Sequence, residues 1–492
     1  MKHYLVQTFG CQMNVHDSRR IEEVLGAEGY QLTTDGALAD LVVVNTCSIR
    51  EKAEHKLMSL LGTLRPWKEE RSNAVLVVAG CVAQQEGENL LAKAPYIDVV
   101  IGPDNIPDLP RLVTAAEGGA PPVARTVFDD DDPRFLIAHP RPEEREVTSF
   151  VTVMKGCDER CTYCIVPHTR GDERYRSADE IVGEIALLAR GGVREVMLLG
   201  QTVNSWHPPE DSNEASDSSD SLDSSDGDPE LPSRFASTSR FPELLRRIAR
   251  EVPELTRLRY TSPHPRHVTP ELVRAHAELD MVPAHVHLPV QSGSDRVLKR
   301  MLRRYTRALF IDRARALMDA RPGLTLATDI IVGFPGETEE DFLETLSLVE
   351  EVGFVSAFCF KYSPRPFTPA LQMGDDVPEA VKSERLARLF EVVAKNQRRH
   401  LDALVGTKQE VLVEGLSRGD EGRYTGRTGR NEIVHLLAPP DHDPTGELVT
   451  VTIDSANKHS LLGSMEGGVT ATAPAAKVRV GLPVIGETAP EP

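Results

Sequence analysis

Short apolar runs alternate with amphipathic, helix-like segments along most of this 492-residue chain. Three runs open the sequence, at His3 to Thr8, Leu41 to Asn45 and Ala74 to Ala79, and helix-like segments such as Asp17 to Glu28 and Ile49 to Leu64 lie between them. Strands that alternate with helices are typical of a parallel α/β sheet. We therefore predict an α/β fold that begins with a doubly wound parallel sheet over residues 1–115.

The same alternation continues through residues 143–400. Strands are predicted at Phe150–Lys155, Glu195–Gly200, Leu255–Thr261, His285–Val290, Leu324–Gly333 and Phe354–Tyr362, with helices such as Arg307–Ala320 and Glu337–Val352 between them. A complete eight-unit barrel needs about 250 residues or more. Because this span holds six units and an insertion, we predict a partial (β/α)6 barrel.

The pattern changes to short β runs after residue 401. Runs at Gln409–Val413, Glu432–Leu437 and Leu448–Ile453, separated by turns with glycine, predict a small β-barrel over residues 401–466. Residues 116–142 are predicted to be a linker, and residues 467–492 are predicted to be a flexible tail. The Ser/Asp/Glu-rich insertion at about 208–239 is predicted to be disordered, because it has too few apolar residues to form a core.

Three cysteines, Cys157, Cys161 and Cys164, follow the first strand of the predicted barrel with Cys-x3-Cys-x2-Cys spacing. A tight loop with this spacing can direct three thiolates at one point. Three ligands on a 4Fe-4S cluster leave one iron open for a substrate or cofactor. A zinc site completed by His168, or a set of packed cysteines, are the alternatives.

Three further cysteines lie far apart in the sequence but occupy equivalent places. Cys11, Cys47 and Cys81 each come just after a predicted strand and before a helix. In a parallel sheet these strand ends share the ligand-binding edge, where helix N-termini favour thiolates and anions. We therefore predict a second three-cysteine cluster there, whereas Cys359, between two phenylalanines in a strand, is expected to be core.

Several motifs resemble the methylthiotransferase family of radical S-adenosylmethionine enzymes, and the likeness extends to about residue 466. They are Gly10-Cys-Gln-Met-Asn14 with Asp17-Ser18, Thr162-Tyr-Cys-Ile-Val-Pro167 with Arg170-Gly171, Leu198-Leu-Gly-Gln201 with Asn204, Leu288 to Ser294, Met301 with Arg303-Arg-Tyr-Thr306, and Asp329 to Glu337. The order of an N-terminal three-cysteine domain, a radical domain and a C-terminal TRAM β-barrel is similar too. The chain departs from the family at Thr202, where Asn is frequent, and at Phe367, where Gly is usual.

The resemblance implies the chemistry and the cofactors. It implies two [4Fe-4S] clusters, one on Cys157, Cys161 and Cys164 that cleaves S-adenosylmethionine to a radical, and one on Cys11, Cys47 and Cys81 that donates sulfur. Two molecules of S-adenosyl-L-methionine would be consumed per turnover. The cofactor pocket is expected at strand ends, at Gln291, Ser292, Gly293, Gly333, Pro335, Gly336 and Glu337, although Gly/Pro turns explain the same residues.

The N-terminal motif indicates the substrate. Cys11-Gln-Met-Asn14 resembles the tRNA-2-methylthio-N6-dimethylallyladenosine synthases, which implies methylthiolation of N6-isopentenyladenosine at tRNA position 37. Methylthiolation of threonylcarbamoyladenosine in tRNA, or of a ribosomal-protein aspartate, is the alternative within the family. An RNA-binding protein with structural zinc and no catalysis is the alternative outside it.

The charge of the chain bears on its partners. A net charge of −19 is acidic for a protein that binds nucleic acid, but residues 208–232 alone hold nine acidic and no basic residues. Local basic groups at Arg423, Arg427 and Arg430, and at Lys299 to Arg307, are candidates for RNA contact. We expect a monomer in the cytoplasm, without a membrane span, that meets the tRNA anticodon loop, a low-potential electron donor and proteins that supply sulfur and clusters.

Overall fold

A computed structural model gives the fold of the chain. It describes residues 2–48, 51–71, 73–128, 135, 137, 139, 146–209, 239–417, 422–439 and 441–465, with the exception of the side chains of residues 51–55. The chain divides into two compact units, residues 1–129 and residues 130–471, apart from the last residues of the chain. The predicted disordered insertion lies almost wholly outside the described residues, and the predicted tail lies outside them.

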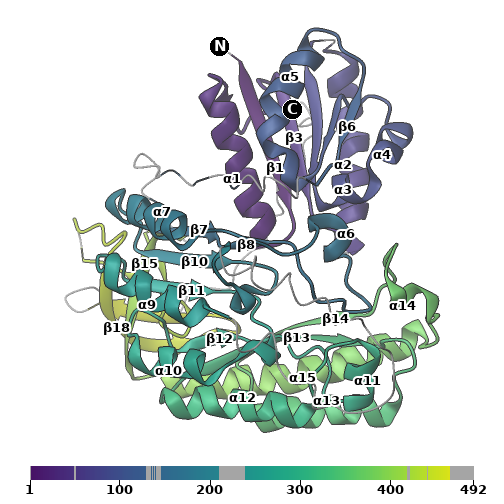
Figure 1. Cartoon of the computed structure of the whole chain (residues 1–492). Coiled ribbons are helices and arrows are strands. Elements are labelled where there is room, and N and C mark those ends of the chain that lie inside the picture. Colours follow the sequence, from purple (N-terminus) through teal and green to yellow (C-terminus); the bar gives the residue numbers. More distant parts are fainter. Residues whose placement is uncertain are drawn as a thin grey trace, which may run out of the picture. The chain divides into compact units, whose positions relative to one another are not determined.

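The first unit is a six-stranded parallel sheet in the order β2-β1-β3-β4-β5-β6 (Figure 1). Its elements are β1 (His3–Phe9), α1 (Gln12–Ala27), β2 (Gln31–Leu32), β3 (Leu41–Thr46), α2 (Glu51–Glu69), β4 (Val75–Gly80), α3 (Cys81–Glu86), α4 (Glu88–Lys93), β5 (Val99–Ile101), η1 (Pro103–Asp108), α5 (Leu109–Glu117) and β6 (Val123–Arg125). The chain reverses its direction of winding between β1 and β3, and in such sheets ligands bind at that point.

The central strands explain why this sheet forms. Every residue of β3, Leu-Val-Val-Val-Asn-Thr, and of β4, Val-Leu-Val-Val-Ala-Gly, is buried. Strands that are apolar on both faces are typical of parallel sheets covered by helices on each side. The predicted doubly wound sheet is confirmed, and β6 extends it into the segment that the sequence reads as linker.

The second unit contains six parallel strands in two three-stranded ladders, β11-β10-β7 and β12-β13-β14. Its elements are β7 (Thr148–Thr152), β8 (Met154–Lys155), α6 (Val166–Arg170), β9 (Arg174–Tyr175), α7 (Ala178–Arg190), β10 (Glu195–Leu199), η3 (Val203–Ser205), α9 (Phe241–Glu251), β11 (Arg257–Tyr260), η4 (Pro265–His267), α10 (Pro270–Glu278), β12 (His285–His287), α11 (Asp295–Arg300), α12 (Arg307–Ala320), β13 (Thr325–Val332), α13 (Glu339–Val352), β14 (Ser356–Lys361), α14 (Pro369–Gln372) and α15 (Glu379–Leu404). One continuous apolar core joins both ladders to the helices outside them, as expected for a partial barrel.

The chain then forms a closed five-stranded barrel in the order β15-β16-β17-β19-β18. Its strands are β15 (Lys408–Leu416), β16 (Tyr424–Thr428), β17 (Ile433–Leu437), β18 (Leu448–Ala456) and β19 (Leu461–Met465). Gly426 lets two strands approach closely, because a Cβ there would lie 2.4 Å from the Leu412 carbonyl oxygen. The predicted small β-barrel is confirmed. Among the described helices, none is both long and apolar enough to cross a membrane.

Candidate cluster sites and family membership

The first three cysteines lie at one edge of the N-terminal sheet. Phe9 pairs with Thr46, and Thr46 pairs with Gly80, so the ends of β1, β3 and β4 lie side by side. Each cysteine follows one of these paired residues directly or after one residue: Cys11 precedes α1, Cys47 follows β3 and Cys81 begins α3. The predicted placement of the three cysteines at a common edge is therefore seen in the structure.

Two glycines and two asparagines pack this edge tightly. Gly10 has φ 143° and a Cβ on it would lie 2.5 Å from the Cβ of Cys47, while a Cβ on Gly80 would lie 2.3 Å from Asn45 Oδ1. Asn14 donates to Asn45 Oδ1 at 3.1 Å and lies 3.4 Å from the sulfur of Cys11. These contacts fix the backbone positions of the residues that carry the thiols. Cys47 and Cys81 are buried, and Cys11 is half-buried.

The second set of cysteines is held in a loop after β8. Cys157 donates its backbone N–H to Gly171 O, and its sulfur lies 3.3 Å from Thr202 Oγ1. Thr162, between the other two cysteines, donates its N–H to Met301 O and its hydroxyl to Arg300 O. The loop is thus fastened to two separate segments of the barrel. Thr202 is a position where this chain differs from the usual residue of the family, and its hydroxyl lies beside Cys157, a predicted cluster ligand.

Burial favours the protonated form of two of these thiols, those of Cys157 and Cys164. Burial raises the pKa of Cys157, and it raises the pKa of Cys164 to about 12, with the charge of Cys161 as the next cause. Thiols of this kind are protonated at neutral pH, whereas metal ligands must be thiolates. Occupation of this loop by a cluster therefore releases protons from the protein.

A buried arginine faces this loop. Arg303 Nη1 donates to Cys161 Sγ at 3.4 Å, and among the described residues no aspartate or glutamate forms an ion pair with Arg303. A buried cation without a carboxylate fits a site built for an anionic group on Cys161. An iron–sulfur cluster held by three thiolates is such a group. The residues present therefore fit the cluster that the sequence predicts.

The zinc alternative fits the structure less well. A zinc ion with bonds of about 2.3 Å to sulfur draws its ligand atoms to within about 4 Å of one another. Among the described residues, the one group whose ligand atoms all lie within 4.8 Å of one another is Glu159, His264 and His267, and it contains no cysteine. His168, the proposed fourth ligand, lies on α6 with its ring 5.7 Å from that of Phe367.

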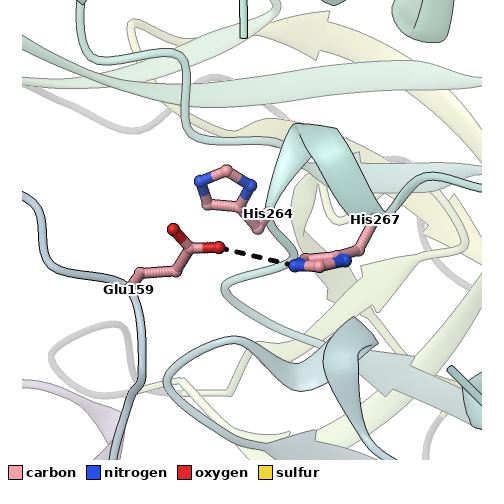
Figure 2. A group of neighbouring side chains, drawn as sticks. All are labelled: Glu159, His264 and His267. Atoms are coloured by element: carbon pink, nitrogen blue, oxygen red, sulfur yellow. Dashed lines mark ion pairs between the residues drawn. The ribbon is translucent and has the colours of Figure 1, made fainter. Parts of the chain in front are cut away.

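This Glu159, His264 and His267 group joins the cysteine loop to η4 (Figure 2). Glu159 Oε1 accepts from Arg266 at 2.8 Å and lies 3.5 Å from His267 Nε2. His264 Nδ1 accepts the N–H of Arg266, so the proton of the neutral ring is on Nε2. Burial lowers the pKa of both histidines, and the charge of Arg303 adds to this effect.

The charges of these residues indicate that the group is a structural anchor, which fastens the cysteine loop to η4, and is not a metal site. Burial alone would raise the pKa of Glu159, but the hydrogen bond from His267 and the charge of Arg266 outweigh it and the pKa is lowered. The carboxylate is therefore ionised and already paired with a guanidinium, and two nearby arginines oppose a divalent cation. The sequence did not indicate this anchor, because Glu159 is over 100 residues from the segment that carries the two histidines and Arg266.

Comparison with known families gives three matches in chain order. Residues 3–102 match the Uncharacterized protein family UPF0004, residues 151–349 match the Radical SAM superfamily, and residues 402–465 match the TRAM domain. Each match falls on one of the three folded parts described above. The arrangement is the one that the sequence motifs predict.

Near full-length relatives carry one name. The chain is 58% identical over 488 residues to the tRNA-2-methylthio-N(6)-dimethylallyladenosine synthase of Sorangium cellulosum (strain So ce56), covering 96% of this chain and 95% of that protein. The chain belongs to this synthase family. Synthases of the same name from Geobacter metallireducens (strain GS-15) and Myxococcus xanthus (strain DK1622) are 45% and 44% identical, each over 94% of this chain and over 97% and 94% of the relatives.

A solved structure supports the fold of this synthase family member. The radical S-adenosylmethionine methyltransferase TsrM from Kitasatospora setae, with cobalamin and a [4Fe-4S] cluster bound, matches with a TM-score of 0.51 and 16% identity, over 75% of this chain and 77% of that chain. At this identity the match concerns the fold alone. The radical S-adenosylmethionine match and the near full-length relatives assign the protein to the radical S-adenosylmethionine transferases, which use S-adenosylmethionine and [4Fe-4S] chemistry.

The residues predicted to bind the cofactor lie at the ends of β12 and β13. Ser292 and Gly293 are buried against α13, where Thr345 Oγ1 accepts the N–H of Gly293 and a Cβ on Gly293 would lie 2.6 Å from Glu344 O. Glu337 accepts the N–H of Gly333 and is paired with Arg385 at 2.9 Å. Gln291 differs from the other predicted cofactor residues because it is a non-glycine residue with a positive φ.

Gln291 is half-buried and has φ 72°, which favours glycine. Strained backbone of this kind clusters at functional sites. Phe367 has φ 65° as well, which explains why glycine is usual there in the family.

The arginines predicted to contact RNA in the β-barrel are engaged within the protein. Arg427 is paired with Glu414 at 3.0 Å, and Arg430 donates to Gln409 at 2.8 Å. Arg257 and Arg259 of β11 donate to the carbonyls of residues 427–429. This segment of the TRAM domain therefore packs against the partial barrel, and its role in RNA contact stays a prediction.

Proposed function

We propose that this protein transfers a methylthio group to carbon 2 of N6-dimethylallyladenosine at position 37 of tRNA. The observation that carries the proposal is the pair of three-cysteine sites, one in each unit, in a chain related over nearly its whole length to synthases of that name. Replacing a C–H bond by a C–S bond requires both hydrogen abstraction and a sulfur source. Two separate clusters provide for these two needs.

Each set of cysteines has its own role in this proposal. Cys157, Cys161 and Cys164 hold the cluster that supplies the electron for radical formation from S-adenosylmethionine. Cys11, Cys47 and Cys81 hold the cluster that supplies sulfur, and a second S-adenosylmethionine supplies the methyl group. Cys157 and Cys161 are buried, and Thr202 and Arg303 orient the thiols of these two residues.

The cofactor pocket is proposed at the ends of β12 and β13. Gln291, with its strained backbone, is the side chain that we expect to contact S-adenosylmethionine. Ser292 and Gly293 fix this turn against α13, and the turn from Gly333 through Pro335 and Gly336 to Glu337 forms the neighbouring wall. The buried pair of Glu337 with Arg385 holds that wall in place.

The proposed partners follow from the reaction. The tRNA anticodon loop presents adenosine 37, a low-potential donor reduces the radical cluster, and sulfur and cluster supply proteins restore the sulfur that each turnover removes. We propose that the enzyme works as a monomer in the cytoplasm, where mature tRNA is modified.

Metal analysis tests the two sites. The chain is purified without oxygen, reconstituted, and compared with two variants in which either Cys157, Cys161 and Cys164 or Cys11, Cys47 and Cys81 are changed to Ala. We expect about eight iron atoms per chain in the wild type and about four in each variant, from four per cluster. Zinc in place of iron, or one variant without any iron, would contradict the two-cluster proposal.

Mass spectrometry of products tests the substrate. The reconstituted enzyme is given S-adenosylmethionine and a reductant with tRNA carrying N6-dimethylallyladenosine, tRNA carrying threonylcarbamoyladenosine, or ribosomal protein. We expect the gain of one sulfur and one methyl group on the first substrate alone. The same gain on either of the other two, and not on the first, would reassign the substrate within the family.

A further inference from the structure

The guanidinium of Arg303 donates a hydrogen bond to a cysteine sulfur, and Arg303 is 6% exposed. Its three guanidinium nitrogens are all used. Nη1 donates to Cys161 Sγ at 3.4 Å, Nη2 donates to Pro289 O at 3.3 Å, and Nε donates to the Tyr305 hydroxyl at 3.2 Å. The Tyr305 hydroxyl in turn donates to Val290 O at 2.7 Å. The guanidinium is therefore held from three directions in a single orientation.

The charge of Arg303 lacks a carboxylate partner among the described residues. An arginine side chain stays protonated in proteins, and burial of a charge without a counter-charge is costly. Two of its acceptors, a carbonyl and a phenol, are neutral. The charge of Arg303 helps to lower the pKa of Glu159, but that carboxylate is paired with Arg266. The remaining acceptor is the sulfur of Cys161. This sulfur is negative when it is a thiolate ligand of an anionic cluster.

The backbone around Arg303 carries a second, independent sign of function. Leu302 has φ 55° and Arg304 has φ 54°, and both side chains are exposed, whereas Arg303 between them is buried. Non-glycine residues in this region are strained, and such strain persists where the surrounding structure holds it for a purpose. The same segment accepts two hydrogen bonds from Thr162 through the carbonyls of Arg300 and Met301. The segment therefore holds the cysteine loop through these hydrogen bonds and places the guanidinium of Arg303 beside that loop.

We propose that Arg303 is a positioning residue that orients the sulfur of Cys161 and raises the reduction potential of the radical cluster. Hydrogen bonds to the ligand sulfurs and local charge are among the factors that set the potential of iron–sulfur clusters. A fixed cation favours the reduced cluster, because the reduced form carries one more negative charge. This role rests on the proposed cluster at Cys157, Cys161 and Cys164, and does not depend on which RNA is the substrate.

Potentiometric titration followed by EPR tests this role in the full chain. Cys11, Cys47 and Cys81 are changed to Ala in every sample, so that the signal comes from the radical cluster alone. Arg303→Met and Arg303→Gln are compared with the parent, and Arg304→Met is the matched control, because it removes one positive charge from the exposed neighbouring position. Iron per chain and the thermal transition are measured on each sample.

We expect the midpoint potential of both Arg303 variants to shift to lower values, with a larger shift in Arg303→Met, while Arg304→Met keeps the midpoint of the parent. If Arg303→Met does not fold, Arg303→Gln, which keeps an N–H donor but has no charge, gives the answer by the same criterion. Folded, iron-loaded Arg303 variants with the parent's midpoint would overturn the proposal. A parent without any cluster signal would overturn the cluster assignment as well, which separates the two failures.

Discussion

At the scale of single residues, the buried histidine His276 makes the protein sensitive to acid. Its side chain is inaccessible to solvent, and its Nε2 lies 2.6 Å from the Tyr260 hydroxyl. Burial, followed by the charge of Arg321, lowers its pKa from 6.5 to about 3. Because the folded-state pKa lies below the unfolded value, the stability from the neutral ring is complete above pH 6.5 and is lost as the pH falls toward 3.

We expect His276→Gln to reduce this sensitivity to acid. One pH unit below 6.5, the folded protein keeps His276 neutral while the unfolded chain protonates it, at a cost of about 1.4 kcal/mol to stability. Urea unfolding at pH 7.5 and pH 5.5 measures the loss, which we expect to be smaller in the variant by about that amount. The exposed His459 provides the control His459→Gln. An equal loss in His276→Gln and in the wild type would show that another group carries the effect.

Residue types decided which members of the sites could be predicted from the sequence. The six cysteines proposed as cluster ligands stand out because cysteine is rare in this chain and because each lies in a segment that follows the end of a strand. Glu159 does not stand out, and Arg303 is noticed only as part of a family motif and of a basic run. Arginine and glutamate are common on surfaces, and only the fold brings Arg303 to Cys161 across a separation of 142 residues.

At the scale of elements, the turn from β1 to α1 shapes the sheet edge that carries the proposed ligands of the N-terminal cluster. Gly10 has φ 143°, and a Cβ added there would lie 2.5 Å from Cys47 Cβ and 2.7 Å from Asn14 Oδ1. We expect Gly10→Ala to displace Cys47 and strain the turn, so that iron per chain falls from about eight to about four while the cluster in the other unit remains.

A glycine within the following helix, α1, provides the control for that change. No atom lies within 4 Å of the position that a Cβ would take on Gly26, so Gly26→Ala should keep all the iron and raise stability by up to about 1 kcal/mol through helix propensity. Iron and sulfide analysis with thermal unfolding compares the two variants. Full iron content in Gly10→Ala would show that the turn tolerates a side chain and does not shape the site.

Element length explains which strands were predicted. The apolar runs of β1, β3 and β4, six or seven residues each, were predicted to within two residues. The strands β2, β5 and β6 have two or three residues, too few for a pattern to be read. β16 was missed for another reason, since its sequence Tyr-Thr-Gly-Arg-Thr contains a glycine and an arginine that read as turn and RNA contact.

At the scale of the whole molecule, the sequence predicted the order and class of the three folded parts, and the family matches at residues 3–102, 151–349 and 402–465 agree with that order. The packing of the β-barrel against the partial barrel was not predicted. It depends on Glu195, Arg257 and Arg259, which lie inside strands where only apolar residues define the pattern. Contacts between distant strands leave no local trace in the sequence.

This packing rests on one buried carboxylate. Glu195 of β10 lies 2.9 Å from Arg259 Nε and 3.8 Å from Arg257 Nη1, and all three side chains are less than 8% exposed. The same two arginines donate to backbone carbonyls of the β-barrel, at Glu410, Arg427, Thr428 and Gly429. Glu195 therefore neutralises the charges through which the two parts of this unit are joined.

We expect Glu195→Gln to destabilise the second unit by about 3–5 kcal/mol, because removal of one partner leaves buried charge without compensation. Amide hydrogen exchange in β16 should rise with it, since the arginines that hold this strand lose their counter-charge. Asp179→Asn, which breaks the exposed pair with Arg247, is the control and should leave the unfolding midpoint in urea unchanged. If Glu195→Gln unfolds at the wild-type midpoint with β16 still protected, the carbonyl contacts alone hold the two parts together, and the ion pair has no structural role.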